Sequence, residues 1–406
     1  MRFVLAAFIA CSTTAPAQES VLTLERAVSI ARERGPLAAT AQAQRMLAQG
    51  RARLEGAFPN PSFEWRREHL SSPLQPDIFV TVQLPIDVTG RRLALRAAGS
   101  ALLARGRADS SSVSRQFEGD VMRAFWRASL GTELVTVAES ERRAREEVAA
   151  FDADRLREGA VAEVAMIRTQ LEADRSRIAE AAARGEAARA LVDLARLLGM
   201  PVESLPPLTR LEAVHTLDAV PDESSAITLA FAQRTDLAAF RHAAREAAHR
   251  ATAERRGLIP DLQLVSGYKQ TSGFTTGVLG VIVPLPLFSR NDGPRERTSG
   301  ELQLARAALR DAELRVRGEV LAAIRSLDAM RGALSGGGAG IDARAAEVAQ
   351  IAEGAYREGA ISLMELVEAQ RARAESRAAA LRWTVDLHLA TLDLNRALGA
   401  PLLEIP

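Results

Sequence analysis

The sequence has few cysteines, histidines and aromatic residues, and each scarcity excludes a kind of site. Its 406 residues include one cysteine, five histidines and 4% aromatics. A disulfide framework needs paired cysteines, and a structural zinc site needs clustered cysteine, histidine or carboxylate ligands. His242 and His249 are seven residues apart rather than four, so we interpret them as surface residues and not as a helical metal pair. No metal or cofactor is therefore expected.

Neither sign of charge is in excess, since the sequence has 52 Lys+Arg and 51 Asp+Glu and a formal net charge of +1. A nucleic-acid surface needs clustered basic residues, whereas Arg alternates here with Glu and Ala, so no nucleic-acid partner is expected. The sequence has no Walker loop, no His-Glu-x-x-His and no Gly-x-Ser-x-Gly motif. Because nothing presents a nucleophile, a base and a metal at workable spacing, the chain is predicted not to be an enzyme.

Long hydrophobic runs are missing as well. The best candidate, residues 277–288, falls short of the roughly 18 to 20 apolar residues that a spanning helix needs, and it includes Pro284 and Pro286. Any membrane crossing must therefore use strands. What the sequence has in abundance is Ala, Leu, Arg and Glu, a composition typical of long helices.

The N-terminus has the pattern of an export signal. Arg2 precedes an apolar run, residues 3–10, and the small-x-small sequence Ala15-Pro16-Ala17 is typical of a cleavage site. We therefore predict a signal peptide over residues 1–17 and a protein of the Gram-negative cell envelope. The single cysteine, Cys11, lies inside this leader. An alternative is a lipoprotein signal with Cys11 lipidated, although Phe8 stands where that pattern has leucine.

The chain repeats itself at an offset of about 200 residues. Residues 157–160, Arg-Glu-Gly-Ala, recur at 357–360, and Leu198-Gly199 with Pro201 recurs as Leu398-Gly399 with Pro401. Such agreement along most of the chain indicates a tandem duplication. We predict a first repeat at 18–200, a proline-rich linker at 201–225 and a second repeat at 226–406.

Each copy shows the same order of periodicities. A helix pair is followed by alternating apolar and polar residues, as in Phe63 and Trp65 against Glu64 and Arg66, which predicts strands. Long helical patterns follow, and Gly336–Gly340 is expected to interrupt the second of them. The predicted elements are strands within 61–85 and 262–284, long helices at 91–157 and 294–357, and return helices at 162–198 and 362–398.

The strand count sets the architecture. Four strands per chain cannot close a sheet, and the open edges of a sheet have no hydrogen-bond partners in lipid. Three chains supply twelve strands, enough for a barrel with a lumen. The predicted fold is therefore mainly α with a small β part: a homotrimer in which long antiparallel coiled-coil helices form a tunnel that continues a 12-stranded β-barrel.

The order of elements resembles that of the TolC-type outer-membrane factors of bacterial efflux and secretion. Residues 284–293, Pro-Leu-Pro-Leu-Phe-Ser-Arg-Asn-Asp-Gly, are similar to the strand-to-helix junction of the cation and heavy-metal branch, and residues 83–92 form the first-copy counterpart. The resemblance implies a passive exit duct in the outer membrane with a periplasmic extension. It also implies two protein partners, a periplasmic adaptor and an inner-membrane pump of the resistance-nodulation-division type.

Two sets of site residues follow from this resemblance. Arg357, Gly359 and Ser362 match the helical tip that meets the adaptor, and Arg157 and Gly159 match it in the first copy, where Ala162 replaces the serine. A physical alternative is that these residues only form helix ends, with glycine at the reversal and arginine near the terminal carbonyls.

Glu365 and Glu368 lie three residues apart on one helix face, where the resemblance implies an acidic pore constriction. A trimer would converge six such carboxylates, which favours cations. The alternative is an ordinary solvated acidic face.

Three functions remain open at this level. The first is an efflux exit duct, the second an outer-membrane port for type I protein secretion, and the third a soluble periplasmic helical scaffold or adaptor. A duct that encloses its cargo in water does not need to recognise it, so the residues do not indicate the substrate.

Overall fold

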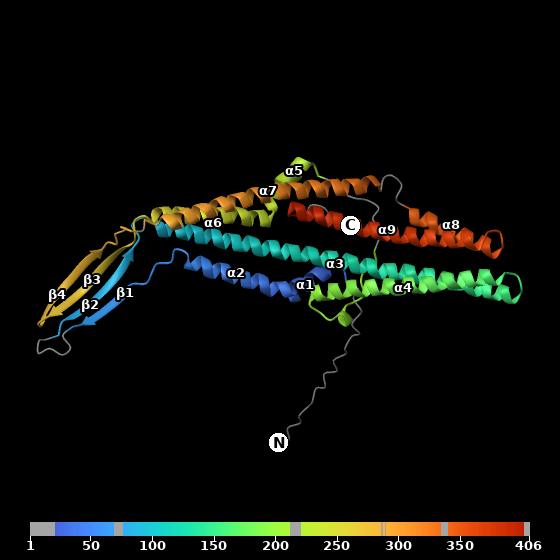
Figure 1. Cartoon of the computed structure of the whole chain (residues 1–406), viewed down its shortest axis with the longest axis horizontal. Helices are drawn as coiled ribbons and strands as arrows, with labels where there is room; N and C mark the ends of the chain where they lie inside the picture. The colour runs from blue at the N-terminus through green and yellow to red at the C-terminus, as the bar shows by residue number, and fades with distance from the viewer. Residues whose placement is uncertain are drawn as a thin grey trace, which may run out of the picture. The chain divides into compact units, whose positions relative to one another are not determined.

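The computed structural model describes residues 21–68, 76–211, 221–285, 287–288, 290–333 and 340–401. The predicted leader with Cys11 and most of the Gly336–Gly340 interruption lie outside these residues. Helices and one small sheet make up the described chain (Figure 1), so the predicted fold class, mainly α with a small β part, is confirmed. No described helix is both long and apolar enough to cross a bilayer.

Each copy contains a helix pair, a strand pair, a long helix and a return helix. In the second copy the long helix is described as two helices, and Gly340, at the start of the later one, has a φ of 91°. The elements are α1 (Leu24–Arg34), α2 (Pro36–Leu54), β1 (Ser62–Arg67), β2 (Ile78–Ile86), α3 (Arg91–Arg157), α4 (Glu163–Leu198), the short 3-10 helix Val202–Ser204, α5 (Glu223–Gln233), α6 (Thr235–Arg256), β3 (Leu262–Thr271), β4 (Phe274–Ile282), α7 (Asp292–Ala333), α8 (Ile341–Arg357) and α9 (Leu363–Leu398).

The chain divides into two compact units that do not coincide with the two copies. Unit 1 comprises residues up to 35, 120–215 and 337–386, and unit 2 comprises residues 36–119, 216–336 and 387–406. Each unit therefore combines segments of both copies. The length of α3 is one reason, because 67 residues at about 1.5 Å each extend over about 100 Å and pass through both units.

Unit 2 holds the sheet, in which four antiparallel strands follow one another in the order β1-β2-β3-β4. One register row joins Trp65, Val80, Tyr268 and Gly277. Gly267 lies against β2 so closely that a Cβ atom there would lie 2.0 Å from the carbonyl oxygen of Val80. The outer strands β1 and β4 pair with no further strand in the described chain, so both edges of the sheet are open.

A charged network fixes the strands to the helices of unit 2. The Asp87 carboxylate accepts hydrogen bonds from the backbone N–H groups of Arg91 and Arg92, at the start of α3. The Arg92 guanidinium also pairs with Asp261, just before β3, at 2.5 Å. Since these residues come from both copies, the two hairpins have a common base.

Unit 1 packs through small residues and through buried polar contacts. A Cβ atom on Gly131 of α3 would lie 3.0 Å from the Cα of Ala187, so α3 and α4 approach closely at this point. Near the helix ends, the Tyr356 hydroxyl of α8 donates to Asp152 of α3 at 2.8 Å, and the two residues are only 7% and 0% exposed. Burial, together with the Asp152 carboxylate, raises the pKa of Tyr356 to about 12, so the hydroxyl stays protonated and able to donate.

We predict that Tyr356→Phe destabilises the protein by about 1–3 kcal/mol, because it leaves a fully buried carboxylate without its hydroxyl donor. Thermal unfolding of the detergent-purified protein measures this loss. Tyr268→Phe is the matched control, since Tyr268 is 44% exposed and loses no buried hydrogen bond. Equal melting temperatures for the two variants would contradict the prediction.

Candidate functional site

The two helix reversals in unit 1 have the same backbone geometry. The turn after α3 places Gly159 at a φ of 73°, and the turn after α8 places Gly359 at a φ of 76°. In each turn the following residue closes a six-residue loop, with Ala160 N–H donating to the Arg155 carbonyl at 2.8 Å and Ala360 N–H to the Ala355 carbonyl at 2.8 Å. This is the Schellman pattern, which favours glycine because the left-handed backbone strains other residues.

The tip arginines pair with carboxylates on their own helices and not with terminal carbonyls. Arg157 pairs with Asp154, and Arg357 pairs with Glu353 at 2.6 Å. The Arg157 and Arg357 side chains are 77% and 63% exposed. Exposed pairs of this kind are weak, so both guanidinium groups remain accessible to a partner protein.

Ser362 and Glu365 form a reciprocal cap at the start of α9. The backbone N–H and the hydroxyl of Ser362 donate to Glu365 Oε2 at 2.7 and 2.8 Å, and the Glu365 N–H lies 3.4 Å from the Ser362 hydroxyl oxygen. These hydrogen bonds, from the Ser362 backbone first and then its hydroxyl, lower the pKa of Glu365. The first copy has no such cap, because Ala162 at the start of α4 offers no side-chain acceptor.

The two predicted pore carboxylates are therefore in different situations. Glu365 is directed back to Ser362, whereas Glu368 is exposed and makes no ion pair with the rest of the described chain. A role as paired pore carboxylates stays a prediction. Among the described residues, no group of three or more histidine, cysteine or carboxylate side chains is placed to hold a metal ion.

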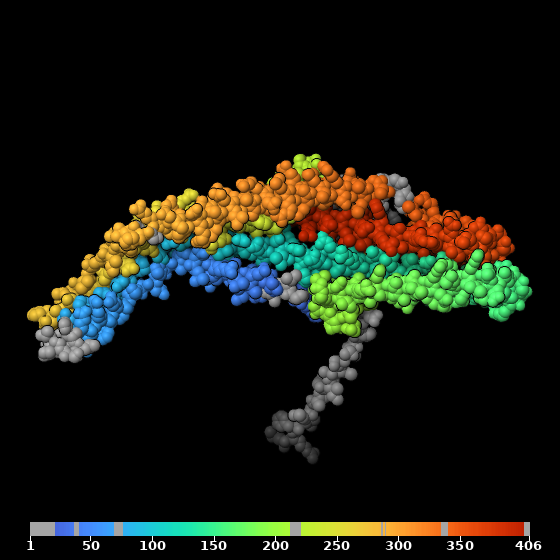
Figure 2. All heavy atoms as spheres, viewed as in Figure 1, coloured from blue at the N-terminus to red at the C-terminus, as the bar shows by residue number. Residues whose placement is uncertain are grey.

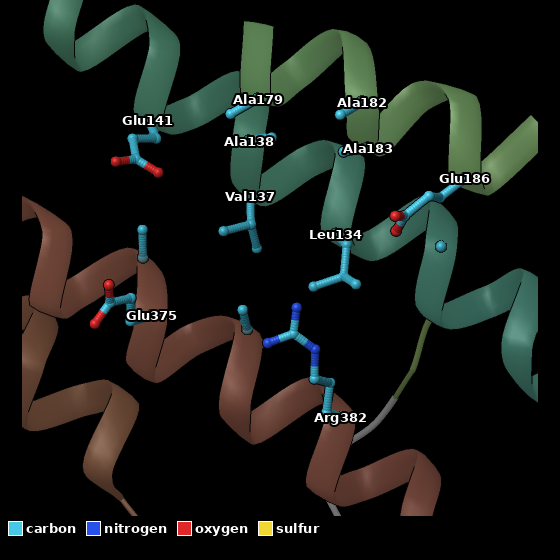
Figure 3. Close-up of a pocket in the computed structure, with 13 residues that line it drawn as sticks. Leu134, Val137, Ala138, Glu141, Ala179, Ala182, Ala183, Glu186, Glu375 and Arg382 are labelled. Carbon is cyan, nitrogen blue, oxygen red and sulfur yellow. The ribbon is translucent and has the colours of Figure 1, made fainter. Parts of the chain in front are cut away.

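Sequence reasoning missed a widely open groove of about 440 Å³ lined by α3, α4 and α9 within unit 1. Small residues line most of it, and Figure 3 shows Glu141 of α3 and Glu375 of α9 on the same side of the opening, with Arg382 directed from α9 toward Leu134. The small lining residues are Gly131, Ala138, Ala179, Ala182, Ala183, Ala374 and Ala378. The three- and four-residue spacings on α4 and α9, and the seven-residue spacing on α3, are a signal of close helix packing in the sequence.

It also missed the polar contacts that link α3 to the helices of the second copy. Asp152 and Tyr356 form one such contact, and the buried Arg145 of α3 donates to the backbone carbonyl of Val367 in α9 at 3.3 Å. Arg145 and Asp152 are seven residues apart, and this repeat of charged residues on one helix face was the available signal.

Comparison with known proteins agrees with this architecture. Residues 226–400 match the family model described as outer membrane efflux protein. The structure of CusC superposes with a TM-score of 0.78 and 19% identity, covering 93% of this chain and 92% of that one. Among curated proteins, none matches the sequence significantly.

Two further outer-membrane protein structures have the same fold. The outer membrane protein VceC of Vibrio cholerae matches with a TM-score of 0.79 and 19% identity over 93% of this chain and 96% of that one. The open outer membrane channel MtrE of Neisseria gonorrhoeae gives 0.76 and 19% over 93% and 89%. The described chain has the fold of these outer-membrane proteins, and residues 226–400 match the family model described as outer membrane efflux protein.

Proposed function

We propose that this protein is the outer-membrane exit duct of a tripartite efflux system, and that cargo passes through it passively. The family match and the channel fold support this function. The observation that carries the proposal is the sheet, because it has one apolar face and two open edges. A sheet of this kind suits a wall between lipid and water once other strands satisfy its edges.

Closure of the sheet requires further copies of the chain. Four strands are too few to surround a lumen, and a sheet edge in lipid leaves N–H and C=O groups without partners. Three copies supply twelve strands, an even number within the range of outer-membrane barrels. The functional unit is therefore a homotrimer in which β1 of one copy pairs with β4 of the next.

The helices of unit 1 support the same cyclic arrangement. On α4, one side packs inward through Thr169, Ala173 and Ser176. A second stripe, on roughly the opposite side, is 49–72% exposed and consists of Val164, Ile167, Leu171 and Ile178. Helix α4 forms the margin of unit 1 in the space-filling view (Figure 2). A helix that buries one side and exposes an apolar stripe on the other fits between two neighbours, of which the structure supplies one.

The other margin of unit 1 offers a matching surface. On α8, Ile341, Val348 and Ile351 are 47–66% exposed, and their spacings of seven and three residues are those of a coiled-coil seam. We assign α8 of the next copy as the second neighbour of α4. First-copy and second-copy elements then meet at each subunit boundary, both in the helices and in the sheet.

The tips of unit 1 are the proposed adaptor contact. They expose Arg157 and Arg357 beside rigid glycine turns, which suits docking to another helical tip. An inner-membrane pump of the resistance-nodulation-division type then lies beyond the adaptor. The cargo is small molecules or metal cations, and its selection takes place at the pump. The similarity of the junction sequence at 284–293 to the cation and heavy-metal branch favours metal cations.

Changes at the second tip test the docking proposal. Gly359→Pro removes the left-handed turn, and Arg357→Asp reverses the exposed charge, so each should reduce efflux at least about tenfold while trimers persist. Export assays and gel mobility of the trimer measure the two effects. Arg315→Asp is the control, because Arg315 is also exposed and also pairs with a carboxylate four residues away, in α7. Normal export by both tip variants would refute docking at this site.

Separating charge from capping tests the pore role. Glutamine can replace glutamate in the cap, so Glu365→Gln combined with Glu368→Ala removes two charges per chain and keeps α9 capped. We expect weaker block by divalent cations in single-channel recordings. Ser362→Ala disturbs the cap and leaves both charges, so it should keep the block. If the double variant behaves like the wild type, the carboxylates are an ordinary solvated face.

Charges in the α4 stripe test the subunit boundary. We expect Ile167→Glu with Leu171→Glu to give monomers in detergent, because two carboxylates would be buried without partners between copies. Light scattering of the purified protein measures the subunit number. Gln170→Glu, at an exposed position beside the stripe, adds a charge outside the contact and should stay trimeric. Trimers of the double variant would exclude this helix face from the boundary.

A further inference from the structure

The apolar face of the sheet changes character near the hairpin turns. Its rows begin beside the helices with Ile86 and Leu262 and continue through Leu84, Leu264 and Val281. The next row contains Phe63, Val82, Ser266 and Leu279. Across these three rows the face carries no charge and only one polar side chain, the serine.

The fourth row introduces aromatic side chains with polar atoms. Trp65 on β1 and Tyr268 on β3 share this row with Val80 and Gly277, and they are 58% and 44% exposed. Tryptophan and tyrosine are enriched where the hydrocarbon of a bilayer meets its headgroups, because one end of each ring system is apolar and the other binds water. The fourth row therefore has the composition of a membrane interface.

The fifth row, nearest the turns, is polar. It contains Arg67, Ile78, Gln270 and Thr275. Among the residues of the four strands, Arg67 is the one charged side chain on this face. It is exposed and has no ion-pair or hydrogen-bond partner in the described part of the chain.

The neighbouring arginine on the same strand is in a different environment. Arg66 points to the other, polar face, where its guanidinium lies 3.6 Å from Glu68 and 4.0 Å from Glu64. It also lies 4.8 Å from the centre of the Phe79 ring. Arg66 thus has internal partners for its charge, whereas Arg67, without a partner among the described residues, presents its cation beside an apolar, aromatic-bordered surface.

We propose that Arg67, with Trp65 and Tyr268, binds the phosphate headgroup of an anionic lipid in the outer leaflet. The inference rests on the proposed outer-membrane location, which puts the hairpin turns on the outer side. A guanidinium matches phosphate oxygens in geometry and charge, and the aromatic row sets it at headgroup depth. Each copy contributes one such site, so a trimer carries three around its outer rim.

The test measures lipid binding to the full-length protein in detergent by native mass spectrometry. The probes are phosphatidic acid, which is anionic, and phosphatidylcholine. We expect the wild type to prefer phosphatidic acid, and Arg67→Ala to reduce that preference about fivefold, the factor that corresponds to about 1 kcal/mol for a basic residue near an anionic lipid surface. Arg66→Ala is the matched control on the same edge strand and should keep the preference.

Two results would overturn the proposal. One is an unchanged preference in Arg67→Ala, or an equal loss in Arg66→Ala. The other is displacement of the lipid by millimolar inorganic phosphate, which would mean that the site binds free anions and not a headgroup. Cell fractionation separates this inference from the proposed function. If the wild type is absent from the outer membrane the function fails, whereas an inserted wild type with an unaffected Arg67→Ala variant removes the lipid site alone.

Discussion

The hydrogen-bonding capacity of the peptide backbone is the constraint on which the rest of this molecule depends. A sheet of four strands has two edges, and water satisfies those edges only if they stay out of lipid. Here the strands carry an apolar face that includes Phe63, Trp65, Leu84 and Leu279, and burial of this face in lipid is favourable. Exposure of the strand edges to lipid is unfavourable. Pairing β1 of one copy with β4 of another resolves both demands. In the proposed trimer, the stripes on α4 and α8 extend the same cyclic contact along the helices.

The duplication explains how one chain can supply two different edges to the proposed ring of three copies. The sheet has a first-copy strand at one edge and a second-copy strand at the other, and the two copies are joined at its centre by β2 and β3. Charged contacts such as Arg92 with Asp261 hold the copies together at the base of the sheet. The reversals have since diverged, because the second has the Ser362–Glu365 cap and the first has Ala162 at the same position.

Local chemistry made much of the fold predictable. Period-two alternation at Phe63 and Trp65 predicted a strand, and the return helix predicted to end at residue 198 does end there, with Gly199 next at a φ of 68°. Ser362 and Glu365 have the spacing of a capping box, yet we interpreted them as adaptor and pore residues. The structure shows that the two residues are hydrogen-bonded to each other and cap the start of α9.

Contacts between distant segments were not predictable in the same way. Tyr356 and Asp152 are 204 residues apart, and no local pattern pairs them. Gly267 has no room for a side chain because β2 passes close to it. This close approach cannot be predicted from the sequence of β3 alone. The arginines at the tips were expected near carbonyls, but Asp154 and Glu353 lie one turn away and offer full negative charges.

Disulfide trapping between the two sheet edges tests the central claim most directly. Within one chain β1 and β4 are separated by three strand spacings, about 14 Å, which is too far for a disulfide bridge. In a Cys11→Ser background, Glu64→Cys on β1 is combined in turn with Thr276→Cys, Val278→Cys and Gly280→Cys on β4, all on the same face. The account predicts that at least one pair gives covalent dimers and trimers on oxidation. Monomers alone from every pair would contradict it.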